Sequence, residues 1–302
     1  MKRSEFLFQT SLVAGATLIG APVFANTQKV KRLTVLHTND THSQIEPLPN
    51  DGRAYAGMGG MARRATLIKE IRSQEENVLL LDAGDMFQGT PYFNYFGGEP
   101  EFKLMSAMGY DAATLGNHDF DNGIAGLDRM LPNAKFSILN ANYDFSRNAL
   151  KGKFKANQVF EKGGIKIGVF GLGIKLAGLV PDTLFQGTKY ADPIAVAKEQ
   201  VADLKKQGAQ LIICLSHLGY EAANDAPSDL MLATQVSGID LIIGGHTHTF
   251  LTEPKAIYHP ETGHQTLINQ VGWAGINLGR IDFTFNGKEK LNNYKSDTYI
   301  VK

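Results

Sequence analysis

Cysteine is nearly absent from this sequence of 302 residues, which has Cys214 as its one thiol and so cannot form an internal disulfide. Cys214 lies within the apolar run 211–215, where we expect a small core side chain rather than a nucleophile. The chain also lacks an excess of charge of either sign, because its 30 basic and 30 acidic residues balance. A neutral chain offers no broad attraction to nucleic acid or to an anionic membrane. It remains compatible with a small anionic substrate held by bound metal.

A long hydrophobic run is lacking at the N-terminus, although the segment there is apolar. Lys2 and Arg3 precede an apolar stretch that is too short and too interrupted for a good membrane span. Val23-Phe24-Ala25 then offers a small-x-small cleavage site. We therefore predict a signal peptide at residues 1–25 and export to the periplasm or the extracellular space. The route, twin-arginine or general secretory, stays open because serine replaces the second arginine of the twin-arginine signal.

Internal repeats, low-complexity tracts and linkers are lacking as well, so we predict a single domain over residues 26–302. Its apolar runs alternate with helical patterns, an order typical of an α/β fold. Strands are expected at 33–37, 78–81, 136–139, 158–160, 165–170, 211–215 and 240–243, and helices at 61–73, 101–108, 124–130, 193–207 and 229–236. We expect Arg63 and Arg64 on a solvated helix face and an aromatic-rich loop at 91–98. Beyond Lys255, alternating residues predict antiparallel strands that close a second sheet.

Five of the apolar runs end in polar residues of the same few kinds. The endings are Asn39-Asp40-Thr41-His42, Asp82-Ala83-Gly84-Asp85, Gly116-Asn117-His118-Asp119, Ser216-His217 and Gly245-His246-Thr247-His248, and they hold five of the eight histidines. A single ending of this kind is compatible with a simple polar turn after a strand. Five of them indicate a shared site, because ligands of open α/β sheets bind at the carboxyl ends of the strands.

The side chains in these endings are suited to binding divalent metals. Asp, His and Asn supply oxygen and imidazole donors, which favour Mn, Zn, Fe or Co over a soft-metal thiolate site. Seven candidate ligands exceed the need of one ion. They fit two ions roughly 3.5–4 Å apart, which clamp the attacking and leaving oxygens of a displacement at phosphorus. His37 lies within its strand, so we expect packing or support of a ligand from it rather than metal binding.

The five endings occur in the order found in the calcineurin-like metallophosphoesterases, and the chain resembles in particular the catalytic domain of the 5′-nucleotidase family. Between the endings, the sequences MSAMGYDA at 105–112, DLIIGGHTHT at 240–249 and QVGWAGINLGRID at 270–282 are similar to that family's connecting segments. The resemblance covers residues 33–285. It implies a four-layer α/β/β/α sandwich with mixed sheets.

The resemblance also implies a division of roles among these residues. One metal would be held by Asp40, His42, Asp85 and His248, and the second by Asp85, Asn117, His217 and His246, with Asp85 as the bridge. A hydroxide that bridges the two metals would attack phosphorus. His118 would assist the leaving group, and Asp121 would orient its ring. Asp119 is expected to support the turn, with a role behind the ligands left open.

An exported phosphomonoesterase of 5′-nucleotides is what the resemblance implies, but other interpretations stay open. The same residues suit a phosphodiesterase or pyrophosphohydrolase acting on cyclic nucleotides or nucleotide sugars, or a non-catalytic metal-binding scaffold. The chain is expected to lack the family's second domain, whose aromatic residues hold the base. Either a separate chain supplies that domain or the substrate is recognised differently, with Tyr92 to Phe96 as a local candidate. The exact substrate, the metals and the oligomeric state stay open.

Overall fold

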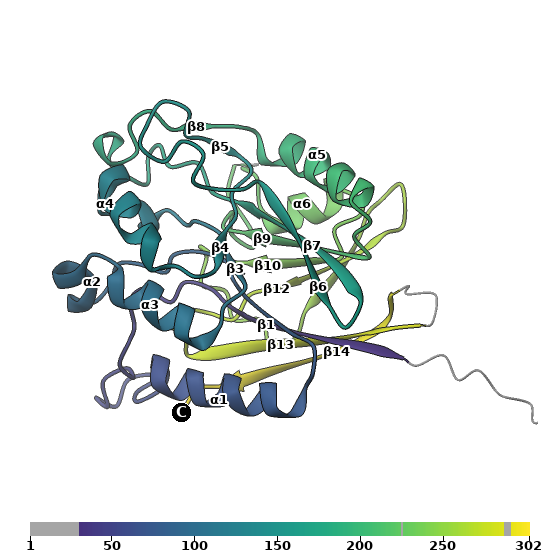
Figure 1. The fold of residues 1–302 in the computed structure, drawn as a ribbon, viewed down its shortest axis with the longest axis horizontal. Coiled ribbons are helices and arrows are strands. Elements are labelled where there is room, and N and C mark those ends of the chain that lie inside the picture. Colours follow the sequence, from purple (N-terminus) through teal and green to yellow (C-terminus); the bar gives the residue numbers. More distant parts are fainter. Residues whose placement is uncertain (1–29, 225, 287–290) are drawn as a thin grey trace, which may run out of the picture.

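The structure is a computed structural model that describes residues 30–224, 226–286 and 291–302. Two six-stranded sheets dominate it (Figure 1). The first contains, in spatial order, β14 (Leu291–Ile300), β13 (Asn277–Phe285), β1 (Lys31–Thr38), β2 (Val78–Asp82), β3 (Ala112–Ala113) and β4 (Ser137–Ile138). The second contains β11 (Lys255–Tyr258), β12 (Gln265–Asn269), β10 (Leu241–Gly244), β9 (Leu211–Ser216), β7 (Ile165–Leu172) and β6 (Asn157–Lys162). A short ribbon pairs β5 (Tyr143–Asp144) with β8 (Lys189–Tyr190).

Helices lie outside the two sheets (Figure 1). They are α1 (Met61–Gln74), α2 (Pro91–Phe96), α3 (Glu99–Met108), α4 (Gly123–Met130), α5 (Pro193–Lys206) and α6 (Asp229–Gln235), with 3-10 turns at η1 (His118–Phe120), η2 (Leu131–Asn133) and η3 (Asp182–Leu184). Helix α5 begins at a side-chain cap, because Asp192 accepts hydrogen bonds from the amides of Ile194 and Ala195. Among the described residues, no helix combines the length and the apolar character that crossing a bilayer requires.

The alternation of side chains along each strand divides the hydrophobic core into three parts. In β2, Leu79 and Leu81 join the core between the two sheets, whereas Leu80 packs into the core that includes residues of α1 and α3. In β9, Ile213 faces the first sheet and Cys214 joins the core under α5 and α6. Cys214 is therefore a buried core residue, as predicted. The three cores define a four-layer α/β/β/α sandwich with mixed sheets, which confirms the predicted fold class.

Parallel strands bring the polar endings to one edge of the molecule. Strands β1 to β4 run parallel to one another, and so do β7, β9, β10 and β12. The carboxyl ends of parallel neighbours lie at the same edge of a sheet. The parallel arrangement therefore brings together the endings after β1, β2, β3, β9 and β10, although they are far apart in the sequence. The signal peptide predicted at residues 1–25 lies outside the described residues.

Three structural predictions were wrong. Residues 91–96 form the helix α2 rather than a loop, because Pro91 suits a first helical turn and Gly97 ends the helix with a left-handed φ of 67°. The strands beyond Lys255 do not close one sheet: β11 and β12 join the second sheet, with β12 parallel to β10, while β13 and β14 extend the first. Arg64 is buried rather than solvated, since it shares a helix face with Met61 and Ile68.

Candidate metal centre

The loops that follow β1 and β2 are joined by backbone hydrogen bonds. The amide of Asp40 donates to the Gly84 carbonyl at 2.9 Å, and the amide of His42 donates to the Asp85 carbonyl at 3.0 Å. A third loop joins them, because the amide of Ala274 donates to the Asp40 carbonyl at 2.7 Å. These bonds set two carboxylates and an imidazole next to one another at the edge of the first sheet.

Most of the predicted ligands have a strained backbone. Residues other than glycine with a left-handed φ include Asp40 (49°), His42 (46°), Asp85 (55°), His246 (72°) and His248 (51°). Such conformations cost of order 1–3 kcal/mol each and persist where the surroundings enforce them, often at functional sites. Strain in five of the seven predicted ligands is therefore independent support for a site built at this edge.

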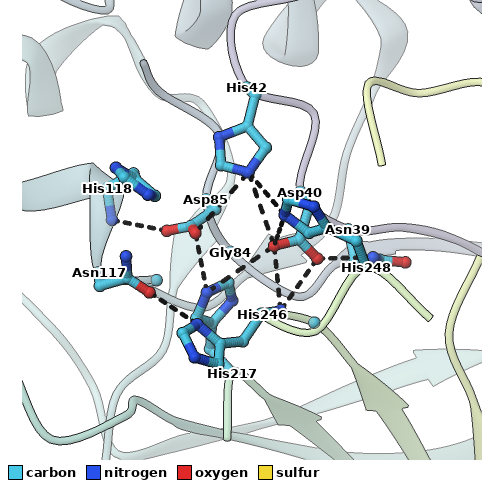
Figure 2. Close-up of polar contacts among 12 residues, drawn as sticks. Asn39, Asp40, His42, Gly84, Asp85, Asn117, His118, His217, His246 and His248 are labelled. Carbon is cyan, nitrogen blue, oxygen red and sulfur yellow. Dashed lines mark hydrogen bonds and ion pairs between the residues drawn. The ribbon is translucent and has the colours of Figure 1, made fainter. Parts of the chain in front are cut away.

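The predicted ligands converge in two groups (Figure 2). The first group, here called the open group, consists of Asp40, His42 and His248, and the second, the buried group, consists of Asp85, His217 and His246. In each group the three donor atoms lie within 4.8 Å of one another. Each group thus has the residue types and the spacing that hold one divalent ion.

Asp85 connects the two groups, and Asn117 enlarges the buried one. An Asp85 carboxylate oxygen lies 3.0 Å from Nε2 of His217 and 3.9 Å from Nε2 of His42, a residue of the open group. The side-chain oxygen of Asn117 lies 2.9 Å from Nδ1 of His246. All seven residues predicted as ligands are therefore gathered in one place, in the geometry expected for two ions with a shared carboxylate. The assignment of each ligand to an ion stays a prediction.

The surroundings of the His217 ring favour positive charge in the buried group. Its Nδ1 lies 2.7 Å from the Ala83 carbonyl oxygen, so Nδ1 carries a proton. Its buried Nε2 faces the Asp85 carboxylate at 3.0 Å. Burial alone would lower the pKa of His217, but the Asp85 charge outweighs it and raises the pKa to about 10. The site therefore favours positive charge between these atoms.

His118 lies beside the two groups but belongs to neither. Its Nδ1 is 2.8 Å from a carboxylate oxygen of Asp121, which fixes the orientation of the ring. This hydrogen bond, together with nearby carboxylates, raises the pKa of His118 against the opposing effect of partial burial. The side chain is 37% exposed, so it can meet a substrate at the rim. Its amide donates to Asp85 at 2.7 Å and ties the rim to the shared carboxylate.

Asp119 supports the loops, as predicted for it. Its carboxylate accepts hydrogen bonds from four backbone amides, those of Asp85, Met86, Phe87 and Gly116. Gly116 is needed for this close fit, because an added Cβ would lie 2.1 Å from the Asp85 carboxylate. The loops after β2 and β3 are thus fastened to each other through one buried side chain.

Two residues near the ligands were missed by the sequence analysis. Asn39 donates hydrogen bonds of 2.6 Å to the Asp40 carboxylate and to the Gly272 carbonyl, so it orients a predicted ligand. Trp273 stacks on the ring of His248, with centroids 6.1 Å apart and an interplanar angle of 17°. Asn39 opens the first polar ending, and Trp273 is the chain's single tryptophan. Those two facts are the signals that could have identified them.

The fold and the paired ligand groups define a class of protein, the metallophosphoesterases, which hydrolyse phosphoric esters with divalent metals. The chain belongs to the calcineurin-like phosphoesterase family, whose model matches residues 33–250. This confirms the resemblance found in the sequence.

Within this family, the chain is similar to 5′-nucleotidases. It is 40% identical over 235 residues to the 5′-nucleotidase of Diplobatis ommata, an alignment that covers 74% of this chain and 39% of the relative. It is 36% identical over 279 residues to the snake venom 5′-nucleotidase of Naja atra, covering 86% and 51%. The solved 5′-nucleotidase precursor from Thermus thermophilus is 35% identical with a TM-score of 0.79, covering 90% and 55%. The chain therefore spans about half the length of these relatives, or less.

Proposed function

We propose that this protein is an exported hydrolase that releases phosphate from phosphate monoesters, with 5′-nucleotides as its substrates. The observation that carries the proposal is the convergence of seven Asp, Asn and His side chains into two adjoining groups, with the His118–Asp121 pair beside them. The relatives are named 5′-nucleotidases, which supports this substrate class.

The ligand groups determine where phosphate would bind. We assign one ion to Asp40, His42, Asp85 and His248, and a second to Asp85, Asn117, His217 and His246. Two divalent ions there would supply Lewis acidity toward the phosphoryl oxygens and a water of lowered pKa. The donor set is compatible with Mn, Zn, Fe or Co.

His118 and Asp121 provide the proton that the leaving group requires. Because Asp121 accepts the hydrogen bond from Nδ1, the other ring nitrogen of His118 is turned away from it. The raised pKa of His118 keeps the ring protonated to a higher pH than an isolated histidine. Transfer of this proton to the departing alkoxide is worth about 10²- to 10⁴-fold in rate.

A substrate panel tests the proposal. The purified protein is stripped of metal, reloaded with Mn²⁺, and assayed for phosphate release from nucleoside 5′-monophosphates, for cleavage of a phosphodiester, and for cleavage of a nucleotide sugar. We expect the monophosphates to be hydrolysed fastest. Faster cleavage of the diester or of the nucleotide sugar would replace the proposed function with the phosphodiesterase or pyrophosphohydrolase interpretation.

The variant His118→Ala separates an enzyme from a scaffold. We expect it to bind metal as the wild type does while losing about 10²-fold or more in kcat. His264→Ala is the matched control, because His264 also lies near a carboxylate, 3.6 Å from Asp240, but outside both ligand groups. Equal inactivity of the wild type and His118→Ala, with metal bound in both, would establish the scaffold interpretation instead.

Export is proposed from the signal-like N-terminus and is consistent with the venom origin stated in the name of one relative. Cell fractionation followed by N-terminal sequencing tests it. We expect the mature protein to begin at Asn26, directly after the predicted cleavage site. An intact N-terminus on a protein retained in the cytoplasm would contradict export without affecting the proposed chemistry.

A further inference from the structure

Aromatic side chains extend from the open group along one rim of the site. Trp273 stacks on His248, whose side chain is 40% exposed. Two residues beyond His248, the ring of Phe250 stacks on Tyr55, with centroids 5.1 Å apart and an interplanar angle of 10°. Trp273 thus contacts one predicted ligand, and the stacked pair of Phe250 and Tyr55 begins two residues along the chain from it. The three rings are here called the aromatic rim.

Phe250 is held in place by the backbone beneath it. It forms a β-bridge with Val271, and the amide of Gly272 donates to the Thr249 carbonyl at 3.0 Å. Gly272 packs against the ring so closely that an added Cβ would lie 2.2 Å from it. One face of Phe250 is therefore covered by main chain, and Tyr55 stacks on the ring.

Tyr55 is the exposed member of the pair. It stands on the connection between β1 and α1 with a left-handed φ of 67°, and it is 38% exposed. The same connection forms a pocket of about 340 Å³, whose lining includes Leu48, Pro49, Arg53, Ala54, Ala56 and Trp273. This volume lies at the lower end of the range for small-molecule sites. The pocket and the aromatic rim share Trp273, the ring that contacts His248.

We propose that the aromatic rim binds the leaving group of the substrate and that this group carries a planar aromatic ring, as a nucleoside does. The inference rests on the proposed function, since it places the phosphate at the ligand groups. The metals can hold a phosphate but cannot distinguish what is attached to it. Discrimination requires contacts outside the ions, and partly exposed aromatic rings on this side of the site provide stacking for any base.

A second aromatic surface provides the matched control. Tyr95 and Phe96, on α2, are 83% and 53% exposed, with ring centroids 6.5 Å apart and an interplanar angle of 54°. They have the same chemistry as the aromatic rim, but their rings are tilted rather than stacked, and neither stacks on a predicted ligand. We therefore expect no contribution from them to base recognition.

Kinetics on two substrates tests the proposal. The ratio of kcat/KM for adenosine 5′-monophosphate to kcat/KM for ribose 5-phosphate measures the preference for a base. We expect Tyr55→Ala and Phe250→Leu each to lower this ratio about 10-fold, mainly through KM for the nucleotide. Tyr95→Ala leaves the ratio unchanged. A ratio that falls in Tyr95→Ala, or that is unaffected in both Tyr55→Ala and Phe250→Leu, would overturn the proposal.

A binding experiment that needs no hydrolysis tests the aromatic rim independently of the proposed enzymatic function. Trp273 is the only tryptophan in the chain, so its fluorescence reports on this rim. We expect adenosine to quench the emission of the wild type and of Tyr95→Ala, and Tyr55→Ala to need about 10-fold more adenosine. Ribose serves as the ligand without a base. If the wild type hydrolyses neither phosphate ester, the proposed function fails while this titration still decides the subsite. Adenosine that quenches all three proteins equally, or none of them, would disprove the subsite.

Discussion

The two ligand groups each combine two buried residues with one partly exposed residue, but His217 and His248 differ in depth. In the buried group the side chain of His217 is fully buried, and its nearest charged neighbour is the Asp85 carboxylate at 3.0 Å. In the open group the side chain of His248 is 40% exposed, and its Nε2 lies 3.4 Å from Asp40. Depth decides what the loss of each histidine costs the fold, because a buried charge without its partner is far more costly than an exposed one. His217 is therefore expected to matter for the protein's stability, whereas His248 is expected to matter mainly for its chemistry.

The largest expected effect comes from replacing Asp85, the residue that connects the two groups. Asp85→Ala removes the carboxylate that reaches both, so we expect both ions to be lost. The rate then falls by at least about 10³-fold, because several kcal/mol of transition-state stabilisation go with the metals. Metal analysis and phosphate release measure this. Asp128→Ala, which removes a surface carboxylate paired with Lys153, is the control. Full retention of one ion in Asp85→Ala would show that the groups are independent.

The comparison between depths is sharpened by truncating one histidine in each group. In the metal-free protein, His217→Ala leaves Asp85 buried without its imidazole, which we expect to cost about 3–5 kcal/mol of unfolding free energy. His248→Ala, at the exposed end, is expected to cost less than about 1 kcal/mol. Urea unfolding in the presence of a chelator measures both. Equal losses of stability would contradict the distinction drawn here.

A smaller effect is expected at the rim, where His118 depends on Asp121. Asp121→Asn removes the carboxylate charge and weakens the hydrogen bond that raises the pKa of His118, so that pKa falls. Because the ring must be protonated to assist the leaving group, activity is retained below its pKa and is lost as the pH rises through it. The variant is therefore expected to lose activity at a lower pH on the alkaline side, with its metal content unchanged. A pH–rate profile of kcat and metal analysis test this, and an unmoved alkaline limb would exclude the role.

The last expected effect concerns His37, which is fully buried and belongs to neither group. Burial lowers its pKa from 6.5 to about 3, so between these values the unfolded chain binds a proton that the folded protein does not. This contribution therefore destabilises the fold progressively as the pH falls below 6.5, by roughly 2 kcal/mol at pH 5. Urea unfolding at pH 7 and pH 5 is expected to show a smaller difference in His37→Gln than in the wild type. The same pH dependence in both proteins would refute this account.

Sequence periodicity was a good guide to the elements that hold the ligands. The apolar runs at 33–37, 78–81, 211–215 and 240–243 all became strands, and the parallel order of these strands brought their polar endings together. The reason is physical. Buried parallel strands require continuous apolar runs, and the carboxyl edge of a sheet is where side chains are free to bind ligands.

Contacts between distant segments could not be predicted from the sequence. Alternation predicted strands after Lys255 but could not say which sheet each joins, because strands of both sheets can have the same pattern. The burial of Arg64 followed its helical phase rather than its charge. Two further contacts are made by loops, whose conformation cannot be predicted from local sequence patterns. They are the stacking of Trp273 on His248 and the hydrogen bond from Asn39 to Asp40.

The four amides gathered by Asp119 have a consequence for how metal enters the protein. One carboxylate fixes the main chain on both sides of Asp85, through bonds that need no ion. The polypeptide's own hydrogen bonds therefore shape the metal site before an ion binds. We therefore expect the loop around Asp85 to keep its conformation when an ion dissociates, so that the next ion can bind without refolding of the chain.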